Sequence, residues 1–120
     1  MTALGQALRV WHAGVGIPAW NMAADELLLK QAAALGQPLL RFYAWSRAAA
    51  TVGYFQRHAE VSGMTALRPL VRRPTAGGLV CHDENEWTYS LVFPPSHPWW
   101  RLKAGESYRC VHDWLRRAFD

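Results

Sequence analysis

The sequence predicts an α+β fold in which a mixed or antiparallel sheet is flanked by helices. The predicted elements follow the order strand, helix, several strands, helix, which does not alternate as a doubly wound fold would. Strong helix formers fill residues 22–35, and β-forming residues alternate in residues 87–93. Prolines and glycines lie between the apolar segments, without a repeat or a linker. We therefore expect residues 1–120 to form one domain.

The composition is that of a globular domain. Of 120 residues, 51% are hydrophobic and 18% are charged, and a chain of this size buries roughly two-thirds of its unfolded surface. Two cysteines, Cys81 and Cys110, are too few for a disulfide scaffold, so we expect reduced thiols and a cytoplasmic protein. No apolar run approaches the ~20 residues of a membrane span, and the first residues lack the apolar core of a signal peptide.

The charge balance favours an anionic partner. Lysine and arginine total 13 against 9 acidic residues, which gives a formal net charge of +4. Only two of these cations are lysines, and arginine is the side chain that binds phosphate and carboxylate in a bidentate manner. A nucleotide, a nucleic acid or an acidic protein would fit this pattern. A surface adapted for solubility would explain it equally well.

The first elements are a short strand, a loop and a helix. Residues 8–12 are β-prone, whereas two glycines and a proline in residues 14–18 predict a turn or loop. Asn21 is expected to cap a helix over residues 22–35. Asp25 is expected in its first turns, where a carboxylate favours the positive end of the helix dipole.

The middle of the chain predicts more strands. Residues 39–45 and 51–55 are each expected as a strand, and the two could pair like a hairpin. Residues 56–64 are polar and could form a short helix. Another strand is expected at residues 70–73, where Pro74 stops it.

The last part predicts two strands and an amphipathic helix. Residues 79–81 and 87–93 are expected as strands, joined by a polar turn over residues 83–86. Apolar residues then recur at spacings of three and four over residues 108–119, which indicates a helix. The chain reaches its last residue without a helix stop signal, so we expect a truncated chain.

The densest candidate site is the segment 72–83. Two arginines precede a hydroxyl and two glycines, and an anion site needs such cations beside a backbone that a ligand can approach closely. The segment is neither a P-loop nor a dinucleotide-binding turn. An ordinary turn between two strands, with exposed arginines, accounts for the same residues.

Cysteine chemistry and metal binding are both disfavoured. In an extended strand Cys81 and His82 point to opposite faces, so they cannot form a thiol–imidazole pair. The histidines have no spacing of a zinc site, and we expect no metal. The seven tryptophans are expected mainly in the core or lining a pocket. Asn21 has a second interpretation as a donor beside a ligand pocket.

Five blocks taken together resemble a known family. They are residues 21–28, 40–45, 51–56, 72–83 and 87–90, and the Arg-Arg-Pro-Thr-Ala-Gly-Gly segment with His82-Asp83 is the most specific of them. In this order they look like the N-terminal half of the family of lipoate-protein ligase A, octanoyl (lipoyl) transferases and biotin-protein ligases. Biotin ligation is the less favoured branch.

The resemblance implies an α+β catalytic domain related to class II aminoacyl-tRNA synthetases. It implies attachment of a lipoyl group, through lipoyl-AMP, to a lysine of an acceptor domain, with ATP, magnesium and lipoate required. The alternative is transfer of an octanoyl group from acyl carrier protein, which needs no cofactor. The implied acceptors are lipoyl domains of 2-oxoacid dehydrogenases and the H protein of glycine cleavage. No membrane partner is expected.

The resemblance also implies site residues, although it assigns no catalytic residue in this chain. The positions that match nucleotide and acyl contacts of the ligases are Arg73, Gly78, Leu79, Val80 and Cys81. The motif positions with less defined roles are Asn21, Arg72, Gly77, His82 and Asp83. In this interpretation Arg73 pairs with a phosphate, and the backbone of residues 77–81 lies against the acyl-adenylate.

Two departures from the family pattern stand out. Ala76 replaces the first glycine of the usual triplet, which adds a methyl group near the site. The glycine-flanked lysine of the family's second half has no counterpart, because neither Lys30 nor Lys103 lies in such a motif. We therefore expect a fragment that is inactive alone. The remaining alternatives are a binding piece completed by a second chain and a nucleic-acid-binding module.

Overall fold

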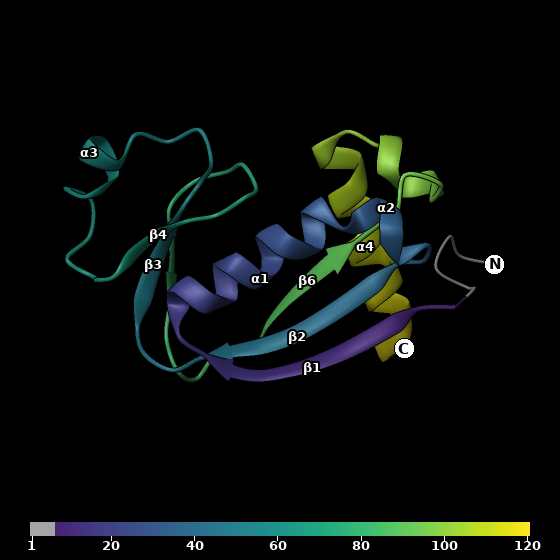
Figure 1. Ribbon diagram of the computed structural model, residues 1–120, viewed down its shortest axis with the longest axis horizontal. Helices are drawn as coiled ribbons and strands as arrows, with labels where there is room; N and C mark the ends of the chain where they lie inside the picture. Colours follow the sequence, from purple (N-terminus) through teal and green to yellow (C-terminus); the bar gives the residue numbers. More distant parts are fainter. Residues whose placement is uncertain (1–6) are drawn as a thin grey trace.

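Two three-stranded mixed sheets form the framework of the computed structural model, which describes residues 7–120 (Figure 1). The first sheet has the order β1-β2-β6 and the second the order β4-β3-β5. In each sheet the central strand pairs in parallel with one neighbour and antiparallel with the other. The strands are β1 (Arg9–Gly16), β2 (Leu39–Trp45), β3 (Ala49–Val52), β4 (Leu70–Arg72), β5 (Val80–His82) and β6 (Thr88–Val92). The α+β prediction is confirmed, with two sheets in place of one.

Helices connect and cover the sheets. They are α1 (Pro18–Lys30), α2 (Ala32–Leu35), α3 (His58–Val61), the 3-10 helix η1 (Pro98–Arg101) and α4 (Ala104–Phe119). Figure 1 shows α1 running from the β4-β3-β5 sheet toward the end of the molecule where α2 and α4 lie. Because α1 and α2 join the parallel strands β1 and β2, residues 9–45 form a β-α-β crossover.

The predicted loop at residues 14–18 is wrong over its first part, because β1 continues to Gly16. The pairing with β2 shifts register between His12 and Gly14, and Gly14 has a φ of +72°. A glycine adopts this left-handed conformation without steric cost, so the strand passes through a bulge and resumes its pairing. The chain leaves the sheet only at Ile17, before the helix begins at Pro18.

The predicted helix start at Asn21 is also wrong. The helix begins at Pro18, where the ring of proline suits the first turn, so Asn21 lies inside the helix with a fully buried side chain. Asp25 consequently falls beyond the first turn. The helix ends at Lys30, and residues 32–35 form the separate short helix α2 before Gly36.

The remaining elements match their predictions closely, apart from their pairing. Strand β2 has the predicted bounds, and β4, β6 and the short helix α3 are shorter than predicted. Strand β3 begins two residues before its predicted start, and β5 lies one residue later than predicted. However, β2 and β3 belong to different sheets, so the predicted hairpin of residues 39–45 with 51–55 is wrong. Helix α4 begins four residues before the recognised pattern.

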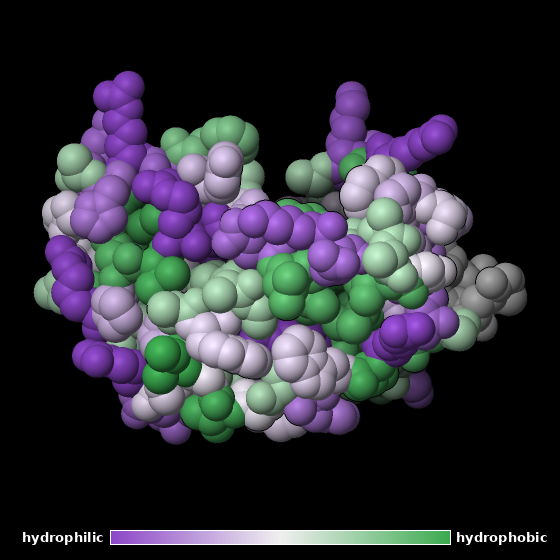
Figure 2. Space-filling model, in the orientation of Figure 1, coloured by the Kyte–Doolittle hydropathy of each residue, from purple (hydrophilic) through white to green (hydrophobic). Residues whose placement is uncertain are grey.

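The tryptophans are predicted mainly in the core or lining a pocket, and the structure places Trp45 in the core and both Trp45 and Trp100 on the wall of the cavity described below. Trp45 is buried at 1% exposure and packs with Met22 and Tyr43. The other indoles are half-buried or exposed, and Trp87 reaches 79% exposure. Figure 2 shows further hydrophobic side chains at the surface along the middle of one face. No helix in residues 7–120 is long and apolar enough to cross a membrane.

Candidate functional site

A cavity of about 460 Å³ lies between the two sheets, with α1 and α4 contributing to its wall. This volume falls in the range typical of small-molecule sites. Its lining residues are Met22, Asp25, Leu29, Tyr43, Trp45, Thr51, Arg73, Pro74, Thr75, Val80, His82, Thr88, Tyr89, Ser90, Leu91, Val92, Phe93, Trp100, Ser107, Tyr108 and Val111. Most of them are aliphatic or aromatic, so the cavity suits a largely apolar ligand.

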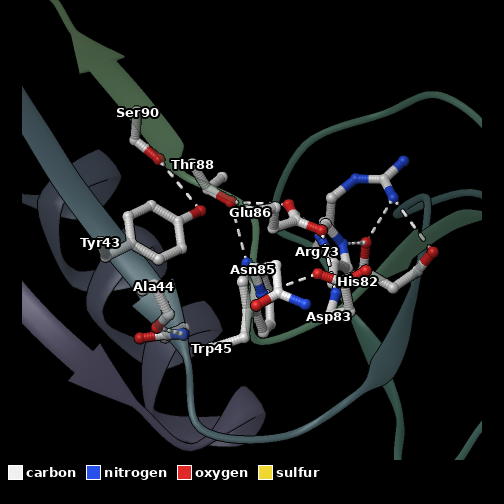
Figure 3. Close-up of polar contacts among 12 residues, drawn as sticks. Tyr43, Ala44, Trp45, Arg73, His82, Asp83, Asn85, Glu86, Thr88 and Ser90 are labelled. Atoms are coloured by element: carbon white, nitrogen blue, oxygen red, sulfur yellow. Dashed lines mark hydrogen bonds and ion pairs between the residues drawn. The ribbon is translucent and has the colours of Figure 1, made fainter.

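Polar groups enter the cavity wall in two clusters. The first, called here the Asp25 network, consists of Arg41, Asp25, Tyr43 and Ser90. The second, called here the His82 relay, consists of Glu86, His82, Thr51 and Arg73. Figure 3 shows parts of both clusters on either side of Trp45.

The Asp25 network surrounds a buried ion pair. Arg41, which has no exposed surface, donates from Nη1 to Asp25 Oδ1 at 2.7 Å. The other carboxylate oxygen of Asp25 accepts the hydroxyl of Ser90 at 2.7 Å and that of Tyr43 at 3.3 Å. The guanidinium of Arg41 also lies 3.8 Å from the ring centroid of Tyr43. Helix α1 and strands β2 and β6 are thereby joined around one charge pair.

Burial raises the pKa of Tyr43 to about 12, and the negative charge of Asp25 adds to this shift. A buried phenol beside a carboxylate resists losing its proton, because the apolar surroundings and the neighbouring negative charge both disfavour the charged phenolate. Tyr43 therefore stays a hydrogen-bond donor at neutral pH. The phenol and the serine together keep Asp25 fully bonded at the cavity wall.

The His82 relay connects a turn to the loop after β4 (Figure 3). Glu86 Oε2 lies 3.0 Å from His82 Nδ1, and His82 Nε2 lies 2.9 Å from Thr51 Oγ1. Arg73 Nη1 then donates to Thr51 Oγ1 at 2.8 Å. The imidazole also stacks on Trp45 with 4.0 Å between ring centroids. Four residues from separate segments thus form one continuous chain of hydrogen bonds.

The pKa of Glu86 lies below its usual value. Burial alone would raise it, but the hydrogen bonds that the carboxylate accepts from His82, from Thr88 and from the backbone N–H of Asp83 outweigh that effect. A carboxylate that accepts several donors favours its ionised form. Glu86 is consequently a charged acceptor at one end of the His82 relay.

Arg73 closes the glycine loop, defined here as residues 73–78. Its Nη1 donates to both the carbonyl and the hydroxyl of Thr51, and its Nη2 donates to the carbonyls of Ala76 and Gly78 at 3.2 and 2.6 Å. Burial lowers the pKa of its guanidinium from the usual value, although an arginine stays charged at neutral pH. All four Nη protons are therefore used within the protein.

The glycine loop also packs directly on the turn after β3. A Cβ atom built on Gly53 would overlap the carbonyl group of Gly77, so only glycine permits this approach. Arg72 supports the same turn, because its Nη1 donates to the carbonyls of Gly53, Tyr54 and Gln56. The two consecutive arginines thus bind different segments.

The structure places three of the predicted site residues on the cavity wall: Arg73, Val80 and His82. Gly77 and Gly78 lie in the exposed glycine loop, and Gly77 lies next to the Arg73 guanidinium. Ligand binding by these residues stays a prediction.

The other predicted site residues lie away from the cavity wall. Asn21 is buried between strands, where its Nδ2 donates to the carbonyls of Gly16 and Ala44. Asp83 accepts the backbone N–H of Asn85 within the turn before β6. Cys81 is exposed on the face of β5 opposite to His82, as expected for an extended strand. Leu79 and Arg72 complete this group.

Sequence reasoning missed most members of both polar clusters. Thr51, Glu86 and Ser90 received no site role, although Thr51 and Ser90 lie in blocks that carry the family resemblance. Asp25 was placed only as a residue that favours the helix dipole. The sequence signal that could have identified them is their position as single polar residues inside mainly apolar segments. No group of three or more metal-ligating side chains occurs within residues 7–120.

Comparison with protein families supports the resemblance. Residues 17–120 match the family model described as lipoyl protein ligase A/B catalytic domain. The chain is 38% identical to octanoyltransferase LipM of Kyrpidia tusciae and 37% identical to octanoyltransferase LipM of Bacillus subtilis. These alignments cover 94% and 92% of this chain but 43% and 41% of the relatives. The chain therefore spans less than half the length of the curated relatives it matches.

Solved structures agree with the fold. A crystal structure of lipoate-protein ligase A bound with ATP matches this chain with a TM-score of 0.66 and 24% sequence identity. The match covers 87% of this chain and 42% of the ligase chain. Protein Ta0514 from T. acidophilum with bound lipoic acid matches 72% of this chain and 37% of its own, with a TM-score of 0.55 and 26% identity. The two neighbours place the described residues in the fold of this class of domain.

Proposed function

Because the chain belongs to the family of lipoyl protein ligase A/B catalytic domains, we propose that its protein transfers an octanoyl group from acyl carrier protein to a lysine of a lipoyl domain. In this proposal residues 1–120 are the N-terminal part of the catalytic domain, and the reaction takes place in the cytoplasm. The observation that carries the proposal is the 38% identity to an octanoyltransferase over 94% of the chain.

The cavity supports an acyl ligand. Its wall combines aliphatic residues such as Met22, Leu29 and Leu91 with aromatic rings, and it opens beside the glycine loop. An eight-carbon chain gains free energy by leaving water for such a wall, at roughly 0.8 kcal/mol per buried CH₂ group. The thioester end of the substrate would then lie near Arg73 and His82. Residues 77–78 offer exposed backbone close to that end.

The reaction balances without a cofactor. The amine of the acceptor lysine attacks the thioester carbonyl, a C–N bond forms as the C–S bond breaks, and the departing thiol takes a proton from the amine. Backbone N–H groups would bond the carbonyl oxygen as charge develops on it, and Arg73 would act only through its nearby positive charge, because its Nη protons are bonded within the protein. No catalytic residue is assigned among residues 7–120.

The sequence first favoured ligation through lipoyl-AMP, and the relatives favour the alternative of octanoyl transfer. The hydrogen bonds of Arg73 support the same choice. A nucleotide phosphate would have to displace carbonyl partners from its Nη atoms, which already make four bonds. ATP, magnesium and free lipoate belong to the ligase alternative, which the fold of the ATP-bound ligase keeps as the second candidate.

One assay separates the two activities. The intact protein is incubated with an unmodified lipoyl domain and either octanoyl-acyl carrier protein or lipoate with ATP and magnesium. Mass spectrometry of the lipoyl domain then detects the added acyl group. We expect modification with the octanoyl donor alone. Modification only with lipoate and ATP would favour the ligase, and no modification in either mixture would overturn acyl transfer.

A matched pair of variants links the activity to the cavity. Leu29 and Leu27 both lie on α1 and both are partly exposed, but only Leu29 lines the cavity. We expect Leu29→Trp to lower octanoyl transfer by about tenfold or more, because the indole fills space that the acyl chain needs. The Leu27→Trp variant should retain activity. Equal activities of the two variants would place the acyl site elsewhere.

A further inference from the structure

The hydrogen bonds of the His82 relay can all be satisfied in a single direction. Glu86 is an ionised acceptor, so the proton between it and His82 belongs to the imidazole Nδ1. In a neutral imidazole Nε2 is then an acceptor, and the hydroxyl of Thr51 donates its one proton to it. The oxygen of Thr51 keeps a lone pair for the N–H of Arg73.

We propose that Glu86, His82 and Thr51 are positioning residues that fix the guanidinium of Arg73, and through it the glycine loop, at the cavity wall. The proposal rests on the proposed function, because it assigns these residues to the acyl-transfer site. Their effect passes through Arg73, whose Nη2 holds the carbonyls of Ala76 and Gly78. The relay therefore extends from the turn before β6 to the loop beside the expected thioester.

The surroundings leave the relay little freedom. The imidazole of His82 is 8% exposed and stacks on Trp45, so its ring plane is fixed. Thr51 has no exposed surface, and its backbone carbonyl accepts a second N–H from the same Arg73 nitrogen. A hydroxyl without access to water must find its partners inside the protein. Its proton and its lone pair are both committed to the relay.

Glu86 sets the direction because its carboxylate only accepts. One oxygen accepts from His82 and Thr88, and the other accepts the backbone N–H of Asp83. In a Glu86→Gln variant the amide NH₂ must replace one of these acceptors. The NH₂ group takes the place of Oε1, where it opposes only the backbone N–H of Asp83, and the amide oxygen keeps the two donors at the Oε2 position, His82 and Thr88. The imidazole proton therefore stays on Nδ1 in this variant, and the hydroxyl of Thr51 keeps its acceptor.

The first test compares Thr51→Val with Thr51→Ser in octanoyl transfer by the intact protein. Valine keeps the shape of threonine and removes the hydroxyl, whereas serine retains the hydroxyl. We expect kcat/KM to fall by about tenfold in Thr51→Val, mainly through kcat, because one bond to a charged group is lost. Thr51→Ser should recover most of that loss. Equal values for the two variants would overturn the proposal.

The second test does not depend on activity. Nitrogen NMR of the His82 imidazole at neutral pH should show the Nδ1–H tautomer in the unsubstituted protein and in Glu86→Gln, where the amide oxygen still accepts from Nδ1. The exposed imidazole of His12 serves as the internal control. An Nε2–H tautomer or an imidazolium in the unsubstituted protein would overturn the relay. If the Nδ1–H tautomer is found but the unsubstituted protein transfers no octanoyl group, the proposed function fails and the relay stands.

Discussion

The Asp25 network and the His82 relay use the same types of group with different results. Each contains an arginine, a carboxylate and at least one hydroxyl group, and each is anchored on the central strand of its sheet, Arg41 on β2 and Thr51 on β3. Arg41 has no exposed surface and lies within 5.5 Å of three aromatic ring centroids. Arg73 is half-buried and holds the glycine loop. Burial therefore separates a cation enclosed within the fold from one that lines the cavity and holds a surface loop.

The largest effect is expected from Arg41→Met. The substitution leaves the Asp25 carboxylate buried without its counter-ion, which typically costs about 3–5 kcal/mol in the free energy of unfolding. Urea denaturation followed by circular dichroism measures the loss. The double variant Arg41→Met/Asp25→Leu should recover much of it, because no charge remains unpaired. A double variant as unstable as the sum of the two single variants would contradict this account of the Asp25 network.

A smaller loss of stability and a larger loss of activity are expected from Gly53→Ala. The new methyl group would overlap the carbonyl of Gly77, so the glycine loop must move away from β3. We expect a cost of about 2 kcal/mol and a fall of about tenfold or more in octanoyl transfer. Gly63→Ala is the control, since its nearest atom lies 3.9 Å from the added Cβ. Equal effects of the two variants would show that the contact with Gly77 has no role.

The fold was largely predictable because its elements follow local patterns. The alternating residues of β2 and β6 and the helix formers of α1 predicted the class and the approximate positions of the elements, although only β2 has its predicted bounds. The misplaced boundaries depend on contacts between distant segments. Pro18 rather than Asn21 begins α1 because the Asn21 amide is used to join β1 to β2. The division into two sheets depends on pairings such as β3 with β5, which no local pattern encodes.

The candidate site was predictable only where residues are consecutive. The segment 72–83 was identified because its arginines, glycines and histidine are close in sequence. Thr51 and Glu86 come from other segments, so only the folded chain brings them to His82. The different roles of Arg72 and Arg73 were equally hidden, because they depend on which distant groups each guanidinium reaches in the folded chain.

Tyr43→Phe tests the Asp25 network through its pH dependence. The pKa of Tyr43 is raised to about 12 by burial and by Asp25, so the folded state keeps a proton that the unfolded state releases near pH 10. Stability should therefore be constant below pH 10 and fall by roughly 2 kcal/mol as the pH rises toward 12. Tyr43→Phe should lower the free energy of unfolding by about 1 kcal/mol at neutral pH, because the hydroxyl hydrogen bond is lost. The variant should also lack the fall in stability between pH 10 and pH 12 that the phenol causes.

Urea midpoints at pH 8 and pH 11 measure the effect. The Tyr54→Phe variant is the control, because Tyr54 is 55% exposed and lies outside the Asp25 network. It should decline with pH as the unsubstituted protein does. If Tyr43→Phe declined just as steeply, the phenol would not be the group that loses stability in alkali.

The smallest effect is expected from Lys30→Ala, which sharpens the comparison within one helix. Asp25 and its neighbour Glu26 each have a basic partner, but the Lys30–Glu26 pair is exposed, with side-chain exposures of 70% and 56% and 3.3 Å between its atoms. Water and mobile ions screen such a pair, so its removal should cost at most about 0.5 kcal/mol. The cost should vanish in 1 M salt, where the screening length is about 3 Å. A loss that rivalled Arg41→Met would mean that charge pairing itself, rather than burial, sets the strength of the Asp25 network.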